Sequence, residues 1–423
     1  MRRLQQEGSS GVIACFYSAS RQGFRLGESC LRIESQSRRI LLTGARAPVT
    51  LELARMFARA GHTVFAADSI AYHGCRFSRA VEQSFLVAPP RQQPEQFIRD
   101  LLAVIRRERI ELLVPTCEEI FYIAQARDEL AAHCQVLAEP IDRLEQLHDK
   151  YRFIEMVQSF GLPVPRTVLC RSQAELSDAL RRWQPADQAV VVKPVFSRFG
   201  ARVAIVTDGK NPLAANEISP DVPWLAQTYA SGTELSSYTL AQEGKVLAHT
   251  TYEGSFRAGI GASIAFAHRD APHIESWVEE VVGRLGFSGQ IAFDLIEAED
   301  GTLYPLECNP RATSGIHLLA SSPNFAPCFF RQPPAPVYPA DASAMLSAAM
   351  WLYGLPAARS ERRLGEWLRT MRTSRDVLFR WNDPLPMLAQ GLALLSFWKR
   401  SRHHDASLLA ATTLDIEWNG EER

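Results

Sequence analysis

Two kinds of hydrophobic pattern alternate along residues 38–140, and they predict strands and helices in turn. RRILLTGARAP, which begins at Arg38, is typical of a buried strand ending in a turn, and VTLELARMFARAG of an amphipathic helix closed by Gly61. HTVFAAD and ELLVPT predict further strands, whereas DLLAVIRRERI and CEEIFYIAQARDEL predict helices. Such alternation is typical of a parallel, doubly wound sheet with helices on its faces.

A mixed arrangement is predicted for the next part of the chain. Asp149 can cap a helix that ends at Gly161, and AVVVKPV predicts a β-branched strand with Lys193 near its end. WLAQTYASGTELSSYTLAQEGKVLAHTTYEG predicts antiparallel strands, and HIESWVEEVVGRLGF predicts a helix. The proline-rich QPPAPVYP then predicts a linker to a mostly helical region.

These patterns divide the chain into five expected parts. Residues 1–37 show no clear periodicity, which predicts a poorly ordered extension. We assign a Rossmann-like domain to 38–140 and two further subdomains to 141–225 and 226–330. In the C-terminal region, 331–423, PMLAQGLALLSFWKRSRHH is apolar and then basic. It predicts either a helix docked on the core or one lying on a membrane surface or partner, and ATTLDIEWNG predicts a strand.

Composition narrows the classes of function. Hydrophobic residues make up 46% and charged residues 22% of the chain, which is ordinary for a soluble globular protein. The formal net charge of −1 gives no support for a nucleic-acid partner. The 8 cysteines form no CxxC pair, which argues against a zinc site or a disulfide framework and favours the reducing cytoplasm. No apolar run reaches the ~20 residues that a transmembrane segment needs.

The stretch FDLIEAEDGTLYPLECNPR predicts a hairpin that places like charges together. Asp300-Gly301 predicts a two-residue turn, and counting back from that turn sets Asp294 opposite Glu307. Asn309 follows on the same face. Two acids and an amide oxygen at this spacing predict a hard-cation site, for which Mg²⁺ bound with nucleotide phosphates is the best fit. The alternative is a solvated hairpin face whose charges repel weakly.

The opposite face of this hairpin is predicted from its alternating apolar residues. They are Ile291, Phe293 and Leu295 before the turn, and Tyr304, Leu306 and Cys308 after it. We therefore expect Cys308 to pack in the core rather than to take part in chemistry.

Taken in order, these elements resemble an ATP-grasp enzyme: a Rossmann-like domain, helix-borne Lys150, the VVKP strand, a hinge strand, and a hairpin ending in ECNPR. The resemblance is closest to the carbamoyl-phosphate-synthetase-like and amino-acid-ligase branches, and it covers roughly residues 38–325. It implies an α/β fold with a Rossmann-like pre-ATP-grasp domain, an ATP-grasp domain and a mostly helical C-terminal extension. It also implies ATP and Mg²⁺ as cofactors, with a pair of Mg²⁺ ions expected and Mn²⁺ as a substitute.

The resemblance implies nucleotide contacts for two lysines. Lys150 is expected at the α-phosphate, and Lys193 at the α- and β-phosphates and the adenine edge, because an ammonium group is a compact cation suited to phosphate. The alternative for each is a solvated surface charge, although Lys193 interrupts a strand that should be buried.

The segment WLAQTYASGTEL resembles the hinge that clamps adenine in this superfamily. The resemblance implies that Gln227 hydrogen-bonds the base beside backbone groups of Thr228 and Tyr229. Glu234, seven residues after Gln227, is then expected to accept the ribose hydroxyls. The alternative is a strand edge followed by an ordinary turn.

For the metal and the reacting groups, the resemblance implies that Asp294 and Glu307 bind Mg²⁺, with Glu307 bridging two ions and Asn309 completing the second ion's shell. Arg311 is expected to contact a transferred phosphoryl group or the substrate carboxylate, for which a planar guanidinium is suited. Arg311, Asn309 and Lys193 are the expected catalytic residues. The reaction implied is phosphorylation of a carboxylate, attack of an amine on the acyl phosphate, and release of ADP and phosphate.

Further residues are expected to border the substrate. Arg257 is the candidate for holding a substrate carboxylate, and its alternative is a flexible solvent loop. Ser314 and Gly315 are expected to shape the same cavity, whereas His317 is expected to be structural. Small-molecule carboxylate and amine substrates are the expected partners, and an oligomer stays open.

One departure from the family pattern leaves a second class of function open. The lid stretch FSRFGAR, residues 196–202, has a single glycine, although Arg198 and Arg202 can act as charge clamps. A nucleotide-binding regulator with little turnover is therefore an alternative. A third class, an oxidoreductase that binds NAD through residues 38–70 and Asp68, is disfavoured because the GxGxxG fingerprint is absent.

Overall fold

The computed structural model describes residues 37–183, 189–197, 202–208, 210–214, 217–258 and 262–420. The predicted extension, residues 1–37, lies outside the described residues except for Ser37, as do Arg198 and the glycine of the lid. Three sheets organise the described chain.

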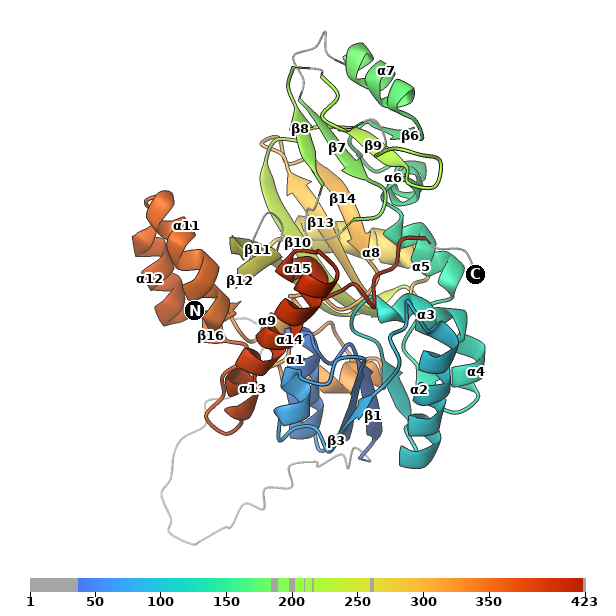
Figure 1. Ribbon diagram of the computed structural model, residues 1–423, viewed down its shortest axis with the longest axis vertical. Helices are drawn as coiled ribbons and strands as arrows, with labels where there is room; N and C mark the ends of the chain where they lie inside the picture. The colour runs from blue at the N-terminus through green and yellow to red at the C-terminus, as the bar shows by residue number, and fades with distance from the viewer. Residues whose placement is uncertain are drawn as a thin grey trace, which may run out of the picture. The chain divides into compact units, whose positions relative to one another are not determined.

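The first sheet is parallel and five-stranded, in the order β3-β2-β1-β4-β5 (Figure 1). Its strands are β1 (Arg39–Thr43), β2 (Thr63–Asp68), β3 (Gln83–Leu86), β4 (Leu112–Val114) and β5 (Gln135–Val136). Its helices are α1 (Pro48–Arg59), η1 (Gly74–Phe77), α2 (Pro94–Glu108), α3 (Glu119–Gln125) and α4 (Arg127–Ala131). The predicted doubly wound sheet is confirmed, and its strand order reverses between β1 and β4, which is where ligands bind in such sheets.

The second sheet has four antiparallel strands in the order β6-β9-β7-β8. Its strands are β6 (Thr167–Cys170), β7 (Val190–Pro194), β8 (Ala204–Val206) and β9 (Trp224–Thr228), and the helices α5 (Ile141–His148), α6 (Lys150–Ser159) and α7 (Gln173–Trp183) accompany them. Asp149 caps α6 as predicted, because its side chain accepts from the backbone N–H of Tyr151 at 2.8 Å and of Arg152 at 2.9 Å.

The third sheet has seven strands in the order β14-β13-β10-β11-β12-β15-β16. They are β10 (Thr233–Gln242), β11 (Lys245–Ala258), β12 (Ala262–His268), β13 (Gly289–Glu297), β14 (Leu303–Asn309), β15 (Ser343–Met345) and β16 (Arg375–Asp376). Helix α8 (Pro272–Leu285) packs on one face, where Trp277 meets Phe293 edge-to-face at 5.2 Å between ring centroids. Helix α9 (Ile316–Leu319) and η3 (Ala326–Phe329) share a hydrophobic core with α1 and with Tyr238 of β10.

The β13–β14 hairpin confirms the predicted pairing of Asp294 with Glu307 but corrects its turn. The loop has three residues rather than two, since Ala298 N–H bonds to Thr302 C=O and Gly301 takes the left-handed φ of 82°. A β-bulge between Asp294 and Leu295 then restores the predicted register.

That bulge makes the predicted buried face of β14 wrong in part. Asp294 pairs with Glu307 and Leu295 with Pro305, so Leu306 is the extra residue. The buried members of β14 are consequently Leu303, Pro305 and Cys308. Cys308 packs in the core as expected, whereas Tyr304 and Leu306 are half-buried.

The C-terminal region adds short strands and helices to the other parts. Its helices are α10 (Ser347–Ala349), the π-helical turn η4 (Met350–Gly354), α11 (Leu355–Ser360), α12 (Leu364–Thr373), α13 (Leu385–Leu388), α14 (Gln390–His403) and α15 (Leu408–Ala411). The predicted linker is fastened to β11, because Val337 N–H donates to Leu247 C=O at 2.8 Å. None of the helices among the described residues is long and apolar enough to cross a bilayer.

The strand predicted for ATTLDIEWNG is wrong. Its residues form consecutive turns, in which the backbone N–H groups of Ile416 and Glu417 both donate to Thr413 C=O. Asp415, Ile416 and Trp418 are all buried. Because neighbouring residues are buried together, the segment is packed between elements rather than paired along a sheet edge.

Candidate functional site

Two carboxylates lie side by side at the centre of the candidate site, one on each strand of the β13–β14 hairpin. Asp294 and Glu307 are directly paired across the strands. Ser236 on β10 donates its hydroxyl to Asp294 Oδ1 at 2.6 Å. Burial, together with the neighbouring Glu307, raises the pKa of Asp294 to about 7. The hairpin therefore concentrates negative charge that needs cations to be stable.

Two buried lysines face these carboxylates. Lys150 Nζ, at the start of α6, lies 3.1 Å from Glu307 Oε2 and donates to Ser197 C=O at 3.1 Å. Lys193 Nζ, near the end of β7, donates to Leu306 C=O at 3.2 Å. Burial acts to raise the pKa of Glu307, but the charges of Lys150 and Lys193 outweigh it and lower that pKa to about 2. Burial and the charge of Lys150 lower the pKa of Lys193 to about 8.

The β-bulge positions one of these contacts. Leu306 is the residue that the bulge leaves unpaired on β14, and its carbonyl is the group that accepts from Lys193. A regular strand would direct this carbonyl into the ladder with β13. The irregularity therefore joins the second sheet to the third at the carboxylates.

Asn309 and Arg311 continue from Glu307. Asn309 Nδ2 lies 3.3 Å from Asp294 Oδ2 and 3.4 Å from Glu307 Oε1, whereas Asn309 Oδ1 accepts from Arg311 Nη2 at 3.1 Å. The amide nitrogen, not the oxygen, thus faces the carboxylates. Binding of a cation by the Asn309 oxygen requires the amide to turn about its Cβ–Cγ bond.

Glu118 is a member of the site that the sequence reasoning missed. It is buried immediately before α3, in the connection from β4, and its Oε1 lies 3.6 Å from Arg311 Nη2. Its Oε2 lies 3.8 Å from His148 Nε2 and accepts from Trp418 N–H at 3.3 Å. A signal was present, because an acid at the carboxyl end of a predicted parallel strand lies where such sheets bind ligands.

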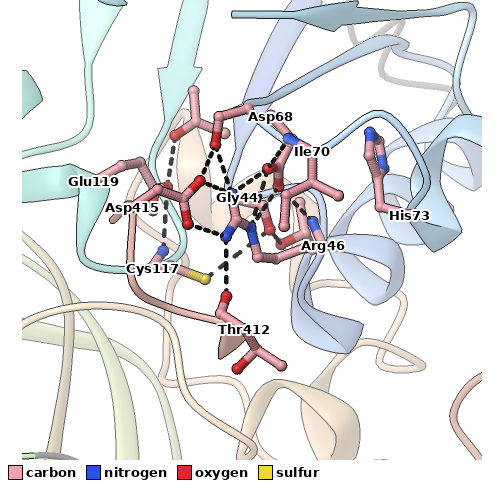
Figure 2. Close-up of polar contacts among 12 residues, drawn as sticks. Gly44, Arg46, Asp68, Ile70, His73, Cys117, Glu119, Thr412 and Asp415 are labelled. Atoms are coloured by element: carbon pink, nitrogen blue, oxygen red, sulfur yellow. Dashed lines mark hydrogen bonds and ion pairs between the residues drawn. The ribbon is translucent and has the colours of Figure 1, made fainter. Parts of the chain in front are cut away.

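The C-terminal segment Thr412–Trp418 covers the carboxyl ends of β1, β2 and β4. Figure 2 shows Arg46, from the turn after β1, between Asp68 and Asp415. Arg46 Nη1 and Nη2 lie 2.7 Å and 2.8 Å from the two carboxylate oxygens of Asp415, and Arg46 Nη1 also donates to Thr412 C=O at 2.9 Å. The ring of Trp418 stacks on Phe121 of α3, with centroids 5.6 Å apart.

These contacts also explain Asp68, the residue considered for a dinucleotide ribose. Its carboxylate accepts from the backbone N–H of Arg46 at 2.7 Å and of Ile70 at 3.0 Å, besides pairing with the Arg46 side chain. Asp68 is buried. The carboxylate therefore serves the internal network, in keeping with the structural reading of this domain.

The hinge residues Gln227, Thr228 and Tyr229 make hydrogen bonds within the second sheet and its surroundings. Gln227 is 1% exposed, and its Nε2 donates to Thr167 Oγ1 on β6 at 2.9 Å. The backbone N–H groups of Thr228 and Tyr229 donate to Arg166 C=O and Ala189 C=O, each at 2.9 Å. These bonds occupy Gln227 Nε2 and the two backbone N–H groups, so a hydrogen bond from any of these donors to adenine would compete with its present bond.

Glu234 and Arg257, expected to contact the ribose and the substrate carboxylate, are brought together. Arg257 Nη2 lies 2.7 Å from Glu234 Oε2, and both side chains are partly exposed. This pair joins β10 to β11 on the part of the sheet that leads to Asp294. A ligand that takes either side chain has to replace or bridge the pair.

Gly315 and His317, which come after Arg311 in the sequence, lie in the core beside the site. A Cβ on Gly315 would lie 2.4 Å from Tyr238 Cβ, so glycine permits a close approach of the chain to β10. Ser314 C=O accepts from His317 N–H at 3.0 Å. Burial lowers the pKa of His317 to about 4, and its ring lies against Phe266. His317 therefore packs in the core, as expected for a structural histidine.

The donor set fits a magnesium nucleotide. In the described parts of the chain, no three His, Cys, Asp or Glu side chains gather as a metal site. Asp294, Glu307 and the amide of Asn309 offer oxygen donors to a hard cation, and Mg²⁺ commonly takes one or two carboxylates and completes its shell with phosphates and water. Lys150 and Lys193 lie where they can meet those phosphates.

Comparison with known proteins agrees with this geometry. Residues 147–315 match a family model described as an ATP-grasp domain. The carbamoyl phosphate synthase arginine-specific large chain of Geobacillus stearothermophilus is 22% identical over 274 residues, covering 62% of this chain and 26% of that protein. Its namesake from Cutaneotrichosporon cutaneum is 24% identical over 200 residues, covering 43% and 17%. This chain thus spans about a quarter or less of these relatives.

Solved structures share the fold. N5-carboxyaminoimidazole synthetase from Staphylococcus aureus aligns with a TM-score of 0.56 and 13% identity, over 74% of this chain and 83% of that chain. The biotin carboxylase domain of 2-oxoglutarate carboxylase from Hydrogenobacter thermophilus, crystallised with MgADP and bicarbonate, aligns with a TM-score of 0.55 and 14% identity, over 71% and 72%. The expected α/β fold class is confirmed.

Proposed function

We propose that this chain, whose residues 147–315 match a family model for the ATP-grasp domain, is an ATP-dependent ligase that joins a carboxylate to an amine. The observation that carries the proposal is the pair of partly buried carboxylates, Asp294 and Glu307, opposed by two buried lysines from other elements. A carboxylate pair of this kind suits a magnesium nucleotide and has no evident structural purpose.

Each residue has a role in this proposal. Lys150 and Lys193 bind the nucleotide phosphates, because each ammonium is held in place by backbone carbonyls. Asp294, Glu307 and a turned Asn309 hold Mg²⁺, which supplies charge neutralisation and orientation of the phosphoryl group. Glu234 and the hinge backbone around Gln227, Thr228 and Tyr229 receive the nucleoside.

Arg311 binds the substrate carboxylate or the phosphoryl group being transferred. Its guanidinium is oriented by Asn309 and lies near Glu118, so it has a fixed position beside Glu307. Arg257, with Ser314 and Gly315, borders the carboxylate substrate. Catalysis in this arrangement consists of positioning and charge neutralisation and needs no covalent protein nucleophile.

The reaction has two steps. A carboxylate oxygen of an amino acid or small acid attacks the γ-phosphorus of ATP, and ADP leaves. The amine then attacks the acyl carbon, phosphate leaves with that oxygen, and the amine loses a proton. We place the reaction in the cytoplasm, and the cysteines of the described chain, all unpaired, suit a reducing compartment.

The test measures ADP, AMP and phosphate after incubation with Mg-ATP and pooled amino acids and small carboxylates. The variant Asp294→Asn/Glu307→Gln removes the paired charges. Its matched control, Glu299→Gln/Asp300→Asn, makes the same chemical change in the turn of the same hairpin, where both residues are exposed. We expect ADP and phosphate that depend on substrate, retained in the control and lost in the site variant.

Other outcomes separate the alternatives. Release of AMP and pyrophosphate would contradict the acyl-phosphate chemistry. Binding of Mg-ATP, measured by calorimetry and abolished in the site variant, without turnover on any pool would favour a nucleotide-binding regulator. The sparse glycine content of FSRFGAR is the observation that keeps this second function in view.

A further inference from the structure

Helix α14 turns several of its large apolar residues toward solvent. Its inward face carries the buried Ala393 and follows the buried Ala389. Three outward residues of α14, together with Leu388 at the end of α13, form what we call the apolar stripe: Leu388 (73% exposed), Leu392 (48%), Leu395 (48%) and Trp398 (50%). Within α14 the spacing of three residues places Leu392, Leu395 and Trp398 along one side of the helix. A soluble helix normally turns such residues toward the core.

Between Asp383 and Asp405 the charged side chains have one sign. Residues 384–404 contain no Asp or Glu. Lys399 and Arg402 are exposed and extend the stripe at its C-terminal end, each four residues beyond a stripe member. The Arg402 guanidinium lies over the Trp398 ring, 5.5 Å from its centroid. By contrast Arg400 is turned inward and lies 3.0 Å from Asp415, so the two outward cations are distinct from the one that fixes the helix.

The length of the helix decides how it can meet a membrane. Its 14 residues span about 21 Å, less than the ~30 Å hydrocarbon core of a bilayer. A helix of this length with an apolar face, an aromatic ring and terminal cations can lie in the plane of the interface. We propose that α14 binds the surface of an anionic lipid bilayer, with the apolar stripe inserted and Lys399 and Arg402 at the headgroups.

Charge favours this occupant over a second copy of the chain. In a dimer with twofold symmetry, the apolar stripe of one chain would face the same stripe of the other chain. Residues 384–404 offer no acid to pair with the cations that this contact would bring near the interface. An anionic headgroup layer supplies that complement, because it attracts Lys and Arg near its surface. The proposal does not rest on the ligase activity and involves none of the residues placed in the site.

The experiment measures cosedimentation of the full chain with vesicles of phosphatidylcholine, with and without about one-third phosphatidylglycerol. Leu392→Gln/Leu395→Gln shortens the stripe, and Leu86→Gln/Val222→Gln, which replaces two exposed apolar residues elsewhere, is the matched control. Lys399→Gln/Arg402→Gln removes the outward cations, and Arg182→Gln/Lys245→Gln removes two exposed cations from other elements as its control.

We expect binding to the anionic vesicles that weakens in ~0.5 M salt and falls at least about tenfold in each α14 variant, with both controls unchanged. Lipids brominated in the acyl chain should quench the wild-type fluorescence more than that of Trp398→Phe, a variant in which the stripe stays apolar. Absence of binding to anionic vesicles would overturn the proposal, as would equal binding to neutral vesicles. If the wild type formed a dimer, bound no vesicles, and dissociated only in the stripe variant, the apolar stripe would be a contact with a second copy of the chain instead.

Discussion

The substitution Asp415→Asn tests whether the C-terminal segment is held by charge. Asp415 is fully buried, and its carboxylate accepts from both terminal nitrogens of Arg46 and from Ser69 Oγ (Figure 2). It also lies 3.0 Å from Arg400 Nη2. Asparagine keeps the shape and one acceptor but removes the charge. The substitution nonetheless leaves Arg46 with a second partner, Asp68, at the other side of its guanidinium.

The expected loss follows from these contacts. Removing one partner of a buried pair commonly destabilises a protein by about 3–5 kcal/mol when the other charge is left alone. Arg46 keeps Asp68, and the amide oxygen of the introduced asparagine can accept one hydrogen bond, so we expect about 2–3 kcal/mol. At a denaturant slope of about 3 kcal/mol per molar urea, this corresponds to a shift of the midpoint of up to about 1 M.

The loss should depend on pH in one direction. Burial acts to raise the pKa of Asp415, but the hydrogen bonds and charge of Arg46 outweigh it and hold that pKa well below its usual range. The folded pKa is thus below the unfolded value of about 3.9. The stabilisation is therefore complete above about pH 4 and fades as the pH falls toward the folded pKa.

Urea unfolding of the wild type and Asp415→Asn, followed by tryptophan fluorescence from about pH 8 to about pH 3, measures both effects. Asp128→Asn, which alters an exposed carboxylate in a weak pair, is the control. The difference between wild type and Asp415→Asn should stay constant down to about pH 5 and narrow below about pH 4. A shift no larger than that of the control, or a difference that widens in acid, would refute the electrostatic account.

Three further substitutions address the site. Gly315→Ala should lower the unfolding free energy by about 1–3 kcal/mol in urea unfolding, because the new methyl would meet Tyr238 Cβ at 2.4 Å; unchanged stability would mean that the chain can move aside. Lys193→Met should weaken Mg-ATP binding at least about tenfold in calorimetry, because it removes a cation from the phosphate site; unaltered affinity would remove Lys193 from the phosphate site. Arg257→Gln should raise KM for the carboxylate substrate and leave KM for ATP unchanged. Arg269→Gln breaks a similarly exposed pair on the adjoining edge of β11, and an equal effect there would argue against a specific role for Arg257.

Much of the site could be predicted from local pattern. Asp294 and Glu307 were placed opposite each other although the turn was one residue too short, because the bulge at Leu306 compensated for the miscounted loop. Neither irregularity changes the sequence alternation enough to be read from it. The contact between the Lys193 ammonium and the Leu306 carbonyl therefore could not be predicted, because that carbonyl can accept from a side chain only when the bulge has formed.

Contacts between distant segments could not be predicted for a different reason. Asp415 reaches Arg46 and Trp418 reaches Glu118 across some three hundred residues of chain. The alternation in ATTLDIEWNG is consistent with a strand. The segment instead packs over the ends of β1 and β4. There three of its neighbouring residues are buried, and its backbone groups are hydrogen-bonded in turns.

By itself, then, the sequence determined the elements and the chemistry of the candidate site, because hydrophobic period, caps and residue types act over a few neighbours. The strand order, the two lysines over the hairpin, the Glu118–Arg311 link and the outward face of α14 depended on the tertiary structure. The physical reason is that burial and charge pairing are properties of surfaces that meet only after folding. The free energy of charge pairing at Arg46 or at Glu307 therefore arises only when the elements that carry the paired groups have come together.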